Sequence, residues 1–221
     1  MPTANLGKGV YIAKIKRSST NQKQNRRIKK LENLVLDSIE WKSKDEVASG
    51  QNVSNAGYAN YPMVAIAQGD TNSTRDGDSV SLRYATLNLA LTRGDTSNIV
   101  RVMMVATPSA THAGLTDVLQ YPNWSTHAEG TLCSPLKVKA TNMEQSYSIL
   151  MDKTYQLRGD ISTIVDKVKI KFPKKGKKLE FGADGSNTPV NYLVSLLAIS
   201  DSTASAHPTI SYQFRYKYID L

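Results

Sequence analysis

The chain has 221 residues and a formal net charge of +9 at pH 7, and its first thirty residues account for all of that charge. They contain nine of the 28 basic residues and no acidic residue, whereas the other 19 basic residues are balanced by 19 acidic ones. The single cysteine, Cys133, excludes an internal disulfide framework, so the fold must rest on an apolar core. The sequence therefore describes a neutral body that carries a cationic arm.

Residues 1–30 are predicted to form a disordered arm. Beyond Ile15 its basic side chains are interleaved with Ser, Thr, Asn and Gln, and this composition cannot bury enough apolar surface to offset the entropy of ordering. A polybasic segment of this kind binds polyanions by neutralising their charge. The candidate nucleic-acid-binding residues of the arm are Lys8, Lys14, Lys16, Arg17, Lys23, Arg26, Arg27, Lys29 and Lys30.

Neither a secretion signal nor a membrane span is predicted. The only apolar stretch near the N-terminus, residues 9–15, is too short for a signal-peptide core and is interrupted by Lys14. No apolar run in the chain is long enough to cross a bilayer. We therefore expect a soluble, unsecreted protein with no membrane partner.

Residues 34–219 are predicted to form eight β-strands, because clusters of Gly, Pro, Asn and Asp separate apolar runs rich in Val, Ile, Leu, Tyr and Thr. In the third run the apolar positions change parity, which predicts a one-residue bulge near Ala85 and Thr86. Helix is predicted only as a turn or two over residues 115–119. The eight runs are residues 34–41, 61–67, 78–91, 98–106, 146–156, 165–172, 190–200 and 209–219.

Two kinds of strand can be distinguished. The runs 99–105 and 192–199 are apolar on both faces, which indicates that their outer faces are covered as well, and contacts between subunits would cover them. The last run has one apolar face, interpreted as core, with stacking on nucleic-acid bases as the alternative. Its aromatic residues are Tyr212, Phe214, Tyr216 and Tyr218.

Eight antiparallel strands with a long connection at about residues 107–145 predict an all-β fold, an eight-stranded antiparallel jelly-roll sandwich. This single domain is expected to span residues 31–221, after the arm. An immunoglobulin-like sandwich is disfavoured because the Cys-Trp-Cys pattern is missing.

Short motifs in a fixed order accompany these strands. They are Glu40-Trp41, Ala67-Gln68-Gly69-Asp70, Thr74-Arg75-Asp76-Gly77-Asp78, Arg93-Gly94-Asp95-Thr96 and Asn98–Val102, followed by Met151–Tyr155 and Tyr212–Tyr216. Over nearly the whole chain their order resembles the capsid proteins of satellite tobacco necrosis virus and of the small circular Rep-encoding single-stranded DNA viruses that share its coat-protein fold. The chain length and residues 152–154 are closer to the DNA-virus group.

The resemblance implies a homo-oligomeric capsid protein, with about 60 jelly-roll subunits in a T=1 icosahedral shell around a single-stranded nucleic acid genome. It implies location in the virion and, during assembly, in the host cell, including the nucleus. In the most specific motif, Gly69 and Gly77 are expected to adopt positive backbone angles, while Arg75 clamps neighbouring carbonyls or an acidic group of the next subunit. An ordinary polar turn is the alternative.

A second basic cluster lies at residues 167–178. Lys167, Lys169 and Lys171 alternate with apolar residues, so they share one face of the predicted strand. We interpret these three lysines as facing the genome, and residues 173–178 as part of that surface or as a nuclear import signal. A solvated strand face and loop is the alternative.

No catalytic site and no required cofactor are predicted. The three histidines, His112, His127 and His207, lack a metal-binding spacing, and Cys133 with His127 is a weak pair for thiol chemistry. Trp41 and Trp124 are interpreted as packing anchors, and Trp124 alternatively as a subunit contact. Calcium between subunits is an alternative to simple turn geometry for four aspartates, Asp70, Asp76, Asp78 and Asp95.

Two other functions stay open beside the capsid hypothesis. One is a non-viral nucleic-acid-binding or chaperone β-sandwich with a basic tail. The other is an extracellular trimeric jelly-roll ligand or lectin, which the missing signal and the cationic arm oppose. Particle formation separates the capsid hypothesis from both.

Overall fold

The computed structural model describes residues 21–32, 40–62, 65–120, 132–137, 147–173, 176–182, 185–203 and 206–220. The chain divides into two compact units, Met1–Glu40 and Trp41–Leu221, and the second is called the body below. In the first unit, residues 21–32 form an α-helix, the arm helix, in which every residue is exposed. The sequence analysis did not predict this helix, although its Gln, Lys and Arg residues favour helix and it contains neither Gly nor Pro.

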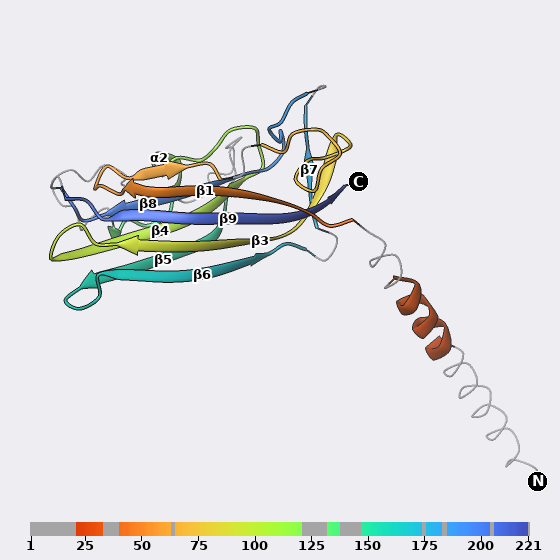
Figure 1. The fold of residues 1–221 in the computed structure, drawn as a ribbon, viewed down its shortest axis with the longest axis horizontal. Helices are drawn as coiled ribbons and strands as arrows, with labels where there is room; N and C mark the ends of the chain where they lie inside the picture. The colour runs from red at the N-terminus through yellow and green to blue at the C-terminus, as the bar shows by residue number, and fades with distance from the viewer. Residues whose placement is uncertain are drawn as a thin grey trace, which may run out of the picture. The chain divides into compact units, whose positions relative to one another are not determined.

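The body consists of two antiparallel β-sheets packed face to face (Figure 1). The first sheet has the strand order β1-β9-β3-β6, with β7 pairing one end of β3, and the second sheet has the order β2-β8-β4-β5. The elements are β1 (Lys42–Asn52), β2 (Tyr58–Asn60), β3 (Ser79–Thr92), β4 (Ser97–Thr107), α2 (Leu115–Val118), β5 (Ser148–Arg158), β6 (Thr163–Lys171), β7 (Lys177–Glu180), β8 (Leu193–Ser200) and β9 (Thr209–Asp220).

The strand order is that of a jelly roll, so the predicted fold class is confirmed. With the short strand β7 left aside, consecutive strands lie in opposite sheets except for β4 and β5, which pair in the second sheet. In the first sheet the last strand, β9, lies between β1 and β3. Strand β7 was not predicted because only Leu179 of its four residues is buried. The predicted short helix is confirmed as α2, a single turn in the long connection between β4 and β5.

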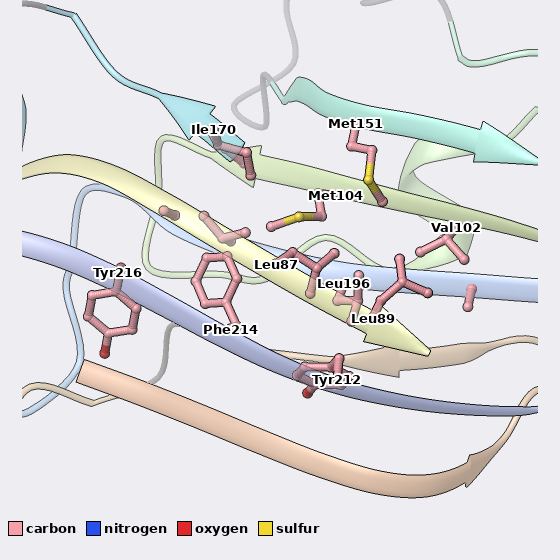
Figure 2. Packing of buried hydrophobic residues seen from close by; sticks show 14 of the residues in the cluster. Leu87, Leu89, Val102, Met104, Met151, Ile170, Leu196, Tyr212, Phe214 and Tyr216 are labelled. Atoms are coloured by element: carbon pink, nitrogen blue, oxygen red, sulfur yellow. The ribbon is translucent and has the colours of Figure 1, made fainter. Parts of the chain in front are cut away.

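The core lies between the two sheets, where alternate side chains of facing strands meet. Figure 2 shows Leu87, Leu89 and Phe214 of the first sheet opposite Val102, Met104 and Leu196 of the second. The predicted aromatic face of the last strand is confirmed as core, because each of its four aromatic residues is at most 5% exposed. The alternative prediction, that this face stacks on nucleic-acid bases, is therefore wrong. Its residues are Tyr212, Phe214, Tyr216 and Tyr218.

A bulge in β3 accounts for the parity change along that strand. The pairing of β3 with β9 shifts register between Leu82 and Tyr84. The buried series therefore passes from Leu82 to Ala85, and Tyr84 lies on the outer face. The predicted bulge is confirmed, two to three residues earlier than expected.

Two strand predictions near the N-terminus need correction. Most of the predicted strand 34–41 falls outside the described residues, and the first strand is β1, a polar edge strand that sequence periodicity does not reveal. The predicted strand 61–67 is wrong, since β2 ends at Asn60 and residues 65–67 are not in a strand. Ile66 is nevertheless buried, so its apolar character reflects a core-facing loop.

Candidate nucleic-acid interface

The arm residues fall into two groups. Lys8, Lys14, Lys16 and Arg17 lie outside the described residues. The other five lie on the arm helix, where the helical repeat places four of them within an arc of about 100°. Ile28, which is 53% exposed, lies on the other side of the helix, and Leu31, which is 61% exposed, lies beside Arg27 at the edge of the arc. The arm helix therefore carries a cationic stripe. The four residues are Lys23, Arg26, Arg27 and Lys30, and Lys29 lies beside them.

The three strand lysines share the outer face of the first sheet, as predicted. Along β6 the exposed Lys167, Lys169 and Lys171 alternate with Val168 and Ile170, which pack into the core. Tyr84 of β3 is the register partner of Lys171 on β6 and of Lys217 on β9. The bulge that moves Tyr84 to the outer face thus places it between two basic strands.

An aromatic pair lies within this basic face. The Tyr84 ring centroid is 6.4 Å from that of Trp41, the residue before β1, and Trp41 is 47% exposed. The ammonium nitrogens of Lys169 and Lys217 lie 5.0 and 5.6 Å from the centroid of the Tyr84 ring. The prediction that Trp41 is a packing anchor is therefore wrong. We call Trp41, Tyr84, Lys169, Lys171 and Lys217 the outer-face cluster.

Most of this cluster cannot be recognised from the sequence. The change of parity in β3 could have placed Tyr84 on the outer face, and the alternation of the last strand could have placed Lys217 there. The contacts within the cluster depend on the register in which β9 pairs with β1 and β3, and no local sequence pattern shows that register.

The outer face is more basic than acidic. Arg215 of β9 binds Asp45 of β1 at two points, with 2.6 Å from Nε to Oδ1 and 2.5 Å from Nη2 to Oδ2. This hydrogen bonding to the guanidinium holds the pKa of Asp45 below its ordinary value. Among the described residues, neither Lys169 nor Lys217 forms a salt bridge with a carboxylate. Their charges are therefore available to an external anion.

Buried charges at the start of β1 serve the fold. The buried Lys42 ammonium lies 2.8 Å from Asp220 and 2.9 Å from Asp76. The hydrogen bond to Asp220 is the main cause that raises the pKa of Lys42, against the effect of burial. These contacts tie the start of β1 and the end of β9 to the turn before β3.

The turn motif around Arg75 holds backbone carbonyls. Arg75 is fully buried and donates to the carbonyls of Gly77 and Ser186, the latter at 2.8 Å, with its guanidinium 4.3 Å from the Phe181 ring centroid. The carbonyl clamp is thus confirmed within one chain. Gly69 has a positive φ of 151°, but Gly77 does not have a positive φ, so the prediction for Gly77 is wrong.

Three of the turn aspartates have partners within the chain. Asp76 pairs with Lys42, Asp78 lies 3.5 Å from the Arg75 guanidinium, and Asp95 accepts the Ser97 amide. In the part of the chain that the structure describes, no group of three or more His, Cys, Asp or Glu residues could hold a metal ion.

The outer face of the second sheet is covered by the chain itself. Met103, Val105 and Leu197 point away from the main core and form a second apolar cluster with residues of the β4–β5 connection. That connection contributes Ala113, Val118, Leu119 and Tyr147. The expectation that other subunits cover the strands apolar on both faces is therefore wrong, because the chain's own connection already covers them.

The described histidines serve local packing. His112 stacks on Tyr61 with ring centroids 4.0 Å apart, and its burial lowers its pKa. His207 Nδ1 lies 3.1 Å from the hydroxyl of Ser202, and no described carboxylate hydrogen-bonds to this histidine. Cys133 is exposed, whereas His127 and Trp124 fall outside the described residues.

Comparison with known proteins identifies no family. No protein-family model and no curated protein matches the sequence. Among solved structures, the semi-empty VLP of the giant freshwater prawn nodavirus matches at 10% identity and a TM-score of 0.40, with 82% of each chain covered. Turnip yellow mosaic virus matches at 8% identity and a TM-score of 0.38, covering 81% of this chain and 90% of that one.

Sacbrood virus of honeybee matches at 12% identity and a TM-score of 0.36, covering 80% of this chain and 72% of that one. Within the described residues, no helix has the length and apolar character needed to span a bilayer.

Proposed function

We propose that this chain is a viral capsid protein that self-assembles into a small icosahedral shell and packages a single-stranded genome through its basic N-terminal arm. The observation that carries the proposal is the separation of roles within the chain. Residues 31–221, which include the jelly-roll body, have zero net charge, and all of the net charge of +9 is in the first thirty residues. A shell that encloses a nucleic acid needs both parts.

Two features support the capsid role: the jelly-roll order of the strands and the order of the short sequence motifs described above. The turn from Gln68 to Gly77 is structurally defined, because Arg75 is fully buried and donates hydrogen bonds to the carbonyls of Gly77 and Ser186. The apolar strands of the second sheet lend no support to assembly, because the chain covers them itself.

The arm supplies the main attraction for the genome in this proposal. Its cations neutralise phosphates and release counterions, which gives affinity without reading the base sequence. Lys167, Lys169 and Lys171 add a smaller contribution from the outer face of the first sheet. We further propose a DNA genome, a T=1 shell of about 60 copies and passage through the host nucleus.

A salt series tests the role of the arm. The affinity of the unassembled full chain for single-stranded nucleic acid should fall steeply with salt, and deletion of residues 1–30 should make the logarithmic slope shallower by up to about 6. The affinity should not depend on base sequence. Equal affinities and equal slopes for the two proteins would show that the arm is not the genome-binding element.

A non-viral nucleic-acid-binding β-sandwich is the second candidate. It is favoured by the outer face of the second sheet, where the chain's own connection covers Met103, Val105 and Leu197. This candidate predicts the same salt dependence but no particles, so assembly distinguishes the two.

A further inference from the structure

Trp41 is the most exposed aromatic residue among the described large hydrophobic side chains of the body, at 47%. It precedes β1 on the outer face of the first sheet, whereas the aromatic residues of β9 in the same sheet are buried. Its only described ring partner is Tyr84, at 6.4 Å between centroids and an interplanar angle of 44°. An exposed indole held against a second ring offers a free stacking face at a fixed place.

Cations lie beside the Tyr84 ring of this aromatic pair. Lys169 and Lys217 approach the Tyr84 ring from neighbouring strands, at 5.0 and 5.6 Å, and Lys171 is the register partner of Tyr84 on β6. The two cation–π contacts hold the ammonium groups beside the Tyr84 ring. Unlike a salt bridge with a carboxylate, these contacts do not neutralise the ammonium charge. The outer-face cluster thus combines a stacking surface with charges that are open to an anion.

This combination fits one class of ligand. A neutral aromatic ligand has no charge to pair with the three lysines, and an acidic peptide would gain little from the indole. A nucleic acid duplex keeps its base faces inside the stack, whereas a single strand presents both phosphates and free base faces. Charge complementarity and the exposed ring together favour a single strand.

We propose that Trp41 and Tyr84 form a base-stacking site for single-stranded nucleic acid, in which Lys169, Lys171 and Lys217 bind the phosphates that flank the stacked base. The site is indifferent to base identity because every base has a stacking face. This inference rests on the proposed function, since it gives the body a contact with the nucleic acid that the arm attracts.

Tryptophan fluorescence tests the site in the full chain. The variant Trp124→Phe leaves Trp41 as the only tryptophan, so its emission reports that residue alone. The probes are a short single-stranded oligothymidine, an abasic oligomer of the same length and charge, and an oligoglutamate. We expect oligothymidine to quench the emission at saturation and the abasic oligomer and oligoglutamate to leave it nearly unchanged.

Affinity measurements use matched variants. Trp41→Leu should weaken oligothymidine binding by about 5- to 100-fold at fixed salt, with little change for the abasic oligomer, and Trp41→Phe should restore most of the loss. Tyr61→Leu, which removes a partly exposed ring beside the second sheet, should leave both affinities unchanged. Unfolding midpoints of all variants show whether each one is folded.

The failures of the two proposals are distinguishable. If the full chain binds oligothymidine with a steep salt dependence but Trp41 is not quenched and Trp41→Leu binds equally, the stacking site is overturned and the arm's role stands. Equal quenching by oligoglutamate would also overturn it, in favour of a general polyanion surface. If the full chain does not bind oligothymidine at all, both proposals fail.

Discussion

Arg101 and Asp152 form a two-point salt bridge across β4 and β5, with 2.9 Å from Nε to Oδ1 and 2.7 Å from Nη2 to Oδ2. The remaining nitrogen of Arg101 donates to the carbonyls of Leu132 and Ser134, at 3.0 and 2.7 Å. Because Arg101 is only 8% exposed, these partners replace the hydrogen bonds that its guanidinium would make with water. A single buried guanidinium thus ties the long connection to the sheet that the connection covers.

Replacing Arg101 should destabilise the body. The variant Arg101→Met leaves the Asp152 carboxylate and two carbonyls without their donor, and we expect the free energy of unfolding to fall by about 2–3 kcal/mol. Arg101→Lys should lose less, because it keeps the charge but not the two-point geometry. Urea unfolding of the unassembled protein measures both. Arg158→Met, an exposed residue of β5, should change stability by less than about 0.5 kcal/mol. A similarly small change for Arg101→Met would contradict this role.

Acid should weaken the contact between β5 and β6. Asp166 accepts hydrogen bonds from Lys153 at 2.8 Å and Tyr155 at 2.7 Å, and these contacts lower the pKa of Asp166, with Lys153 the main cause. Because the folded protein favours the ionised carboxylate, this stabilisation is full above the ordinary Asp pKa of about 3.9 and is lost as the pH falls through the lower folded value.

The variant Asp166→Asn should therefore cost about 0.5–1 kcal/mol at neutral pH, a modest figure because Lys153 is partly exposed. The difference from the unmodified protein should shrink as the pH falls below about 4. Urea unfolding across a pH series measures it. Asp160→Asn, in the exposed turn after β5, serves as the control. A stability difference that grows toward low pH would show that the sign is wrong.

The body should fold without the first unit. The buried apolar residues lie between Val53 and Ile219, and every residue of the arm helix is exposed. Deletion of residues 1–40 should therefore leave the midpoint of thermal unfolding within a few degrees. A helix of this length is marginal without packing, so trypsin should cleave unassembled protein after Arg26 and Arg27. A much lower midpoint, or resistance of those two bonds, would show that the units depend on each other.

The strand lysines should contribute less to binding than the arm. Replacing Lys167, Lys169 and Lys171 together by Gln should make the logarithmic salt slope for single-stranded nucleic acid shallower by up to about 2. Stability should change little because all three are exposed. The charge-matched control replaces three basic residues away from this face, Lys44, Lys137 and Arg158. Equal slopes for the two triple variants would remove the outer face from the proposed interface.

Strong local patterns predicted much of the fold. Strands β4, β8 and β9 have long apolar or alternating runs, and the parity change in β3 signalled its bulge. The alternation around Lys169 also placed the strand lysines on one face. In each case the pattern of one strand is enough to decide which side chains enter the core.

Other features depend on partners far along the chain. Strand β1 is polar, and its strand conformation follows from its pairing with β9. The contact of Trp41 with Tyr84 requires β9 to bring β1 and β3 together, and the second apolar cluster requires the connection to fold back over β4. Apolar character on both faces of a strand therefore did not distinguish a cover within the chain from a cover by another subunit.

Electron microscopy of the purified full chain mixed with single-stranded nucleic acid, supported by sedimentation over a range of salt and pH, tests the capsid proposal most directly. We predict closed particles of uniform size that contain about 60 subunits. Monomers or small oligomers alone under all of these conditions would contradict it.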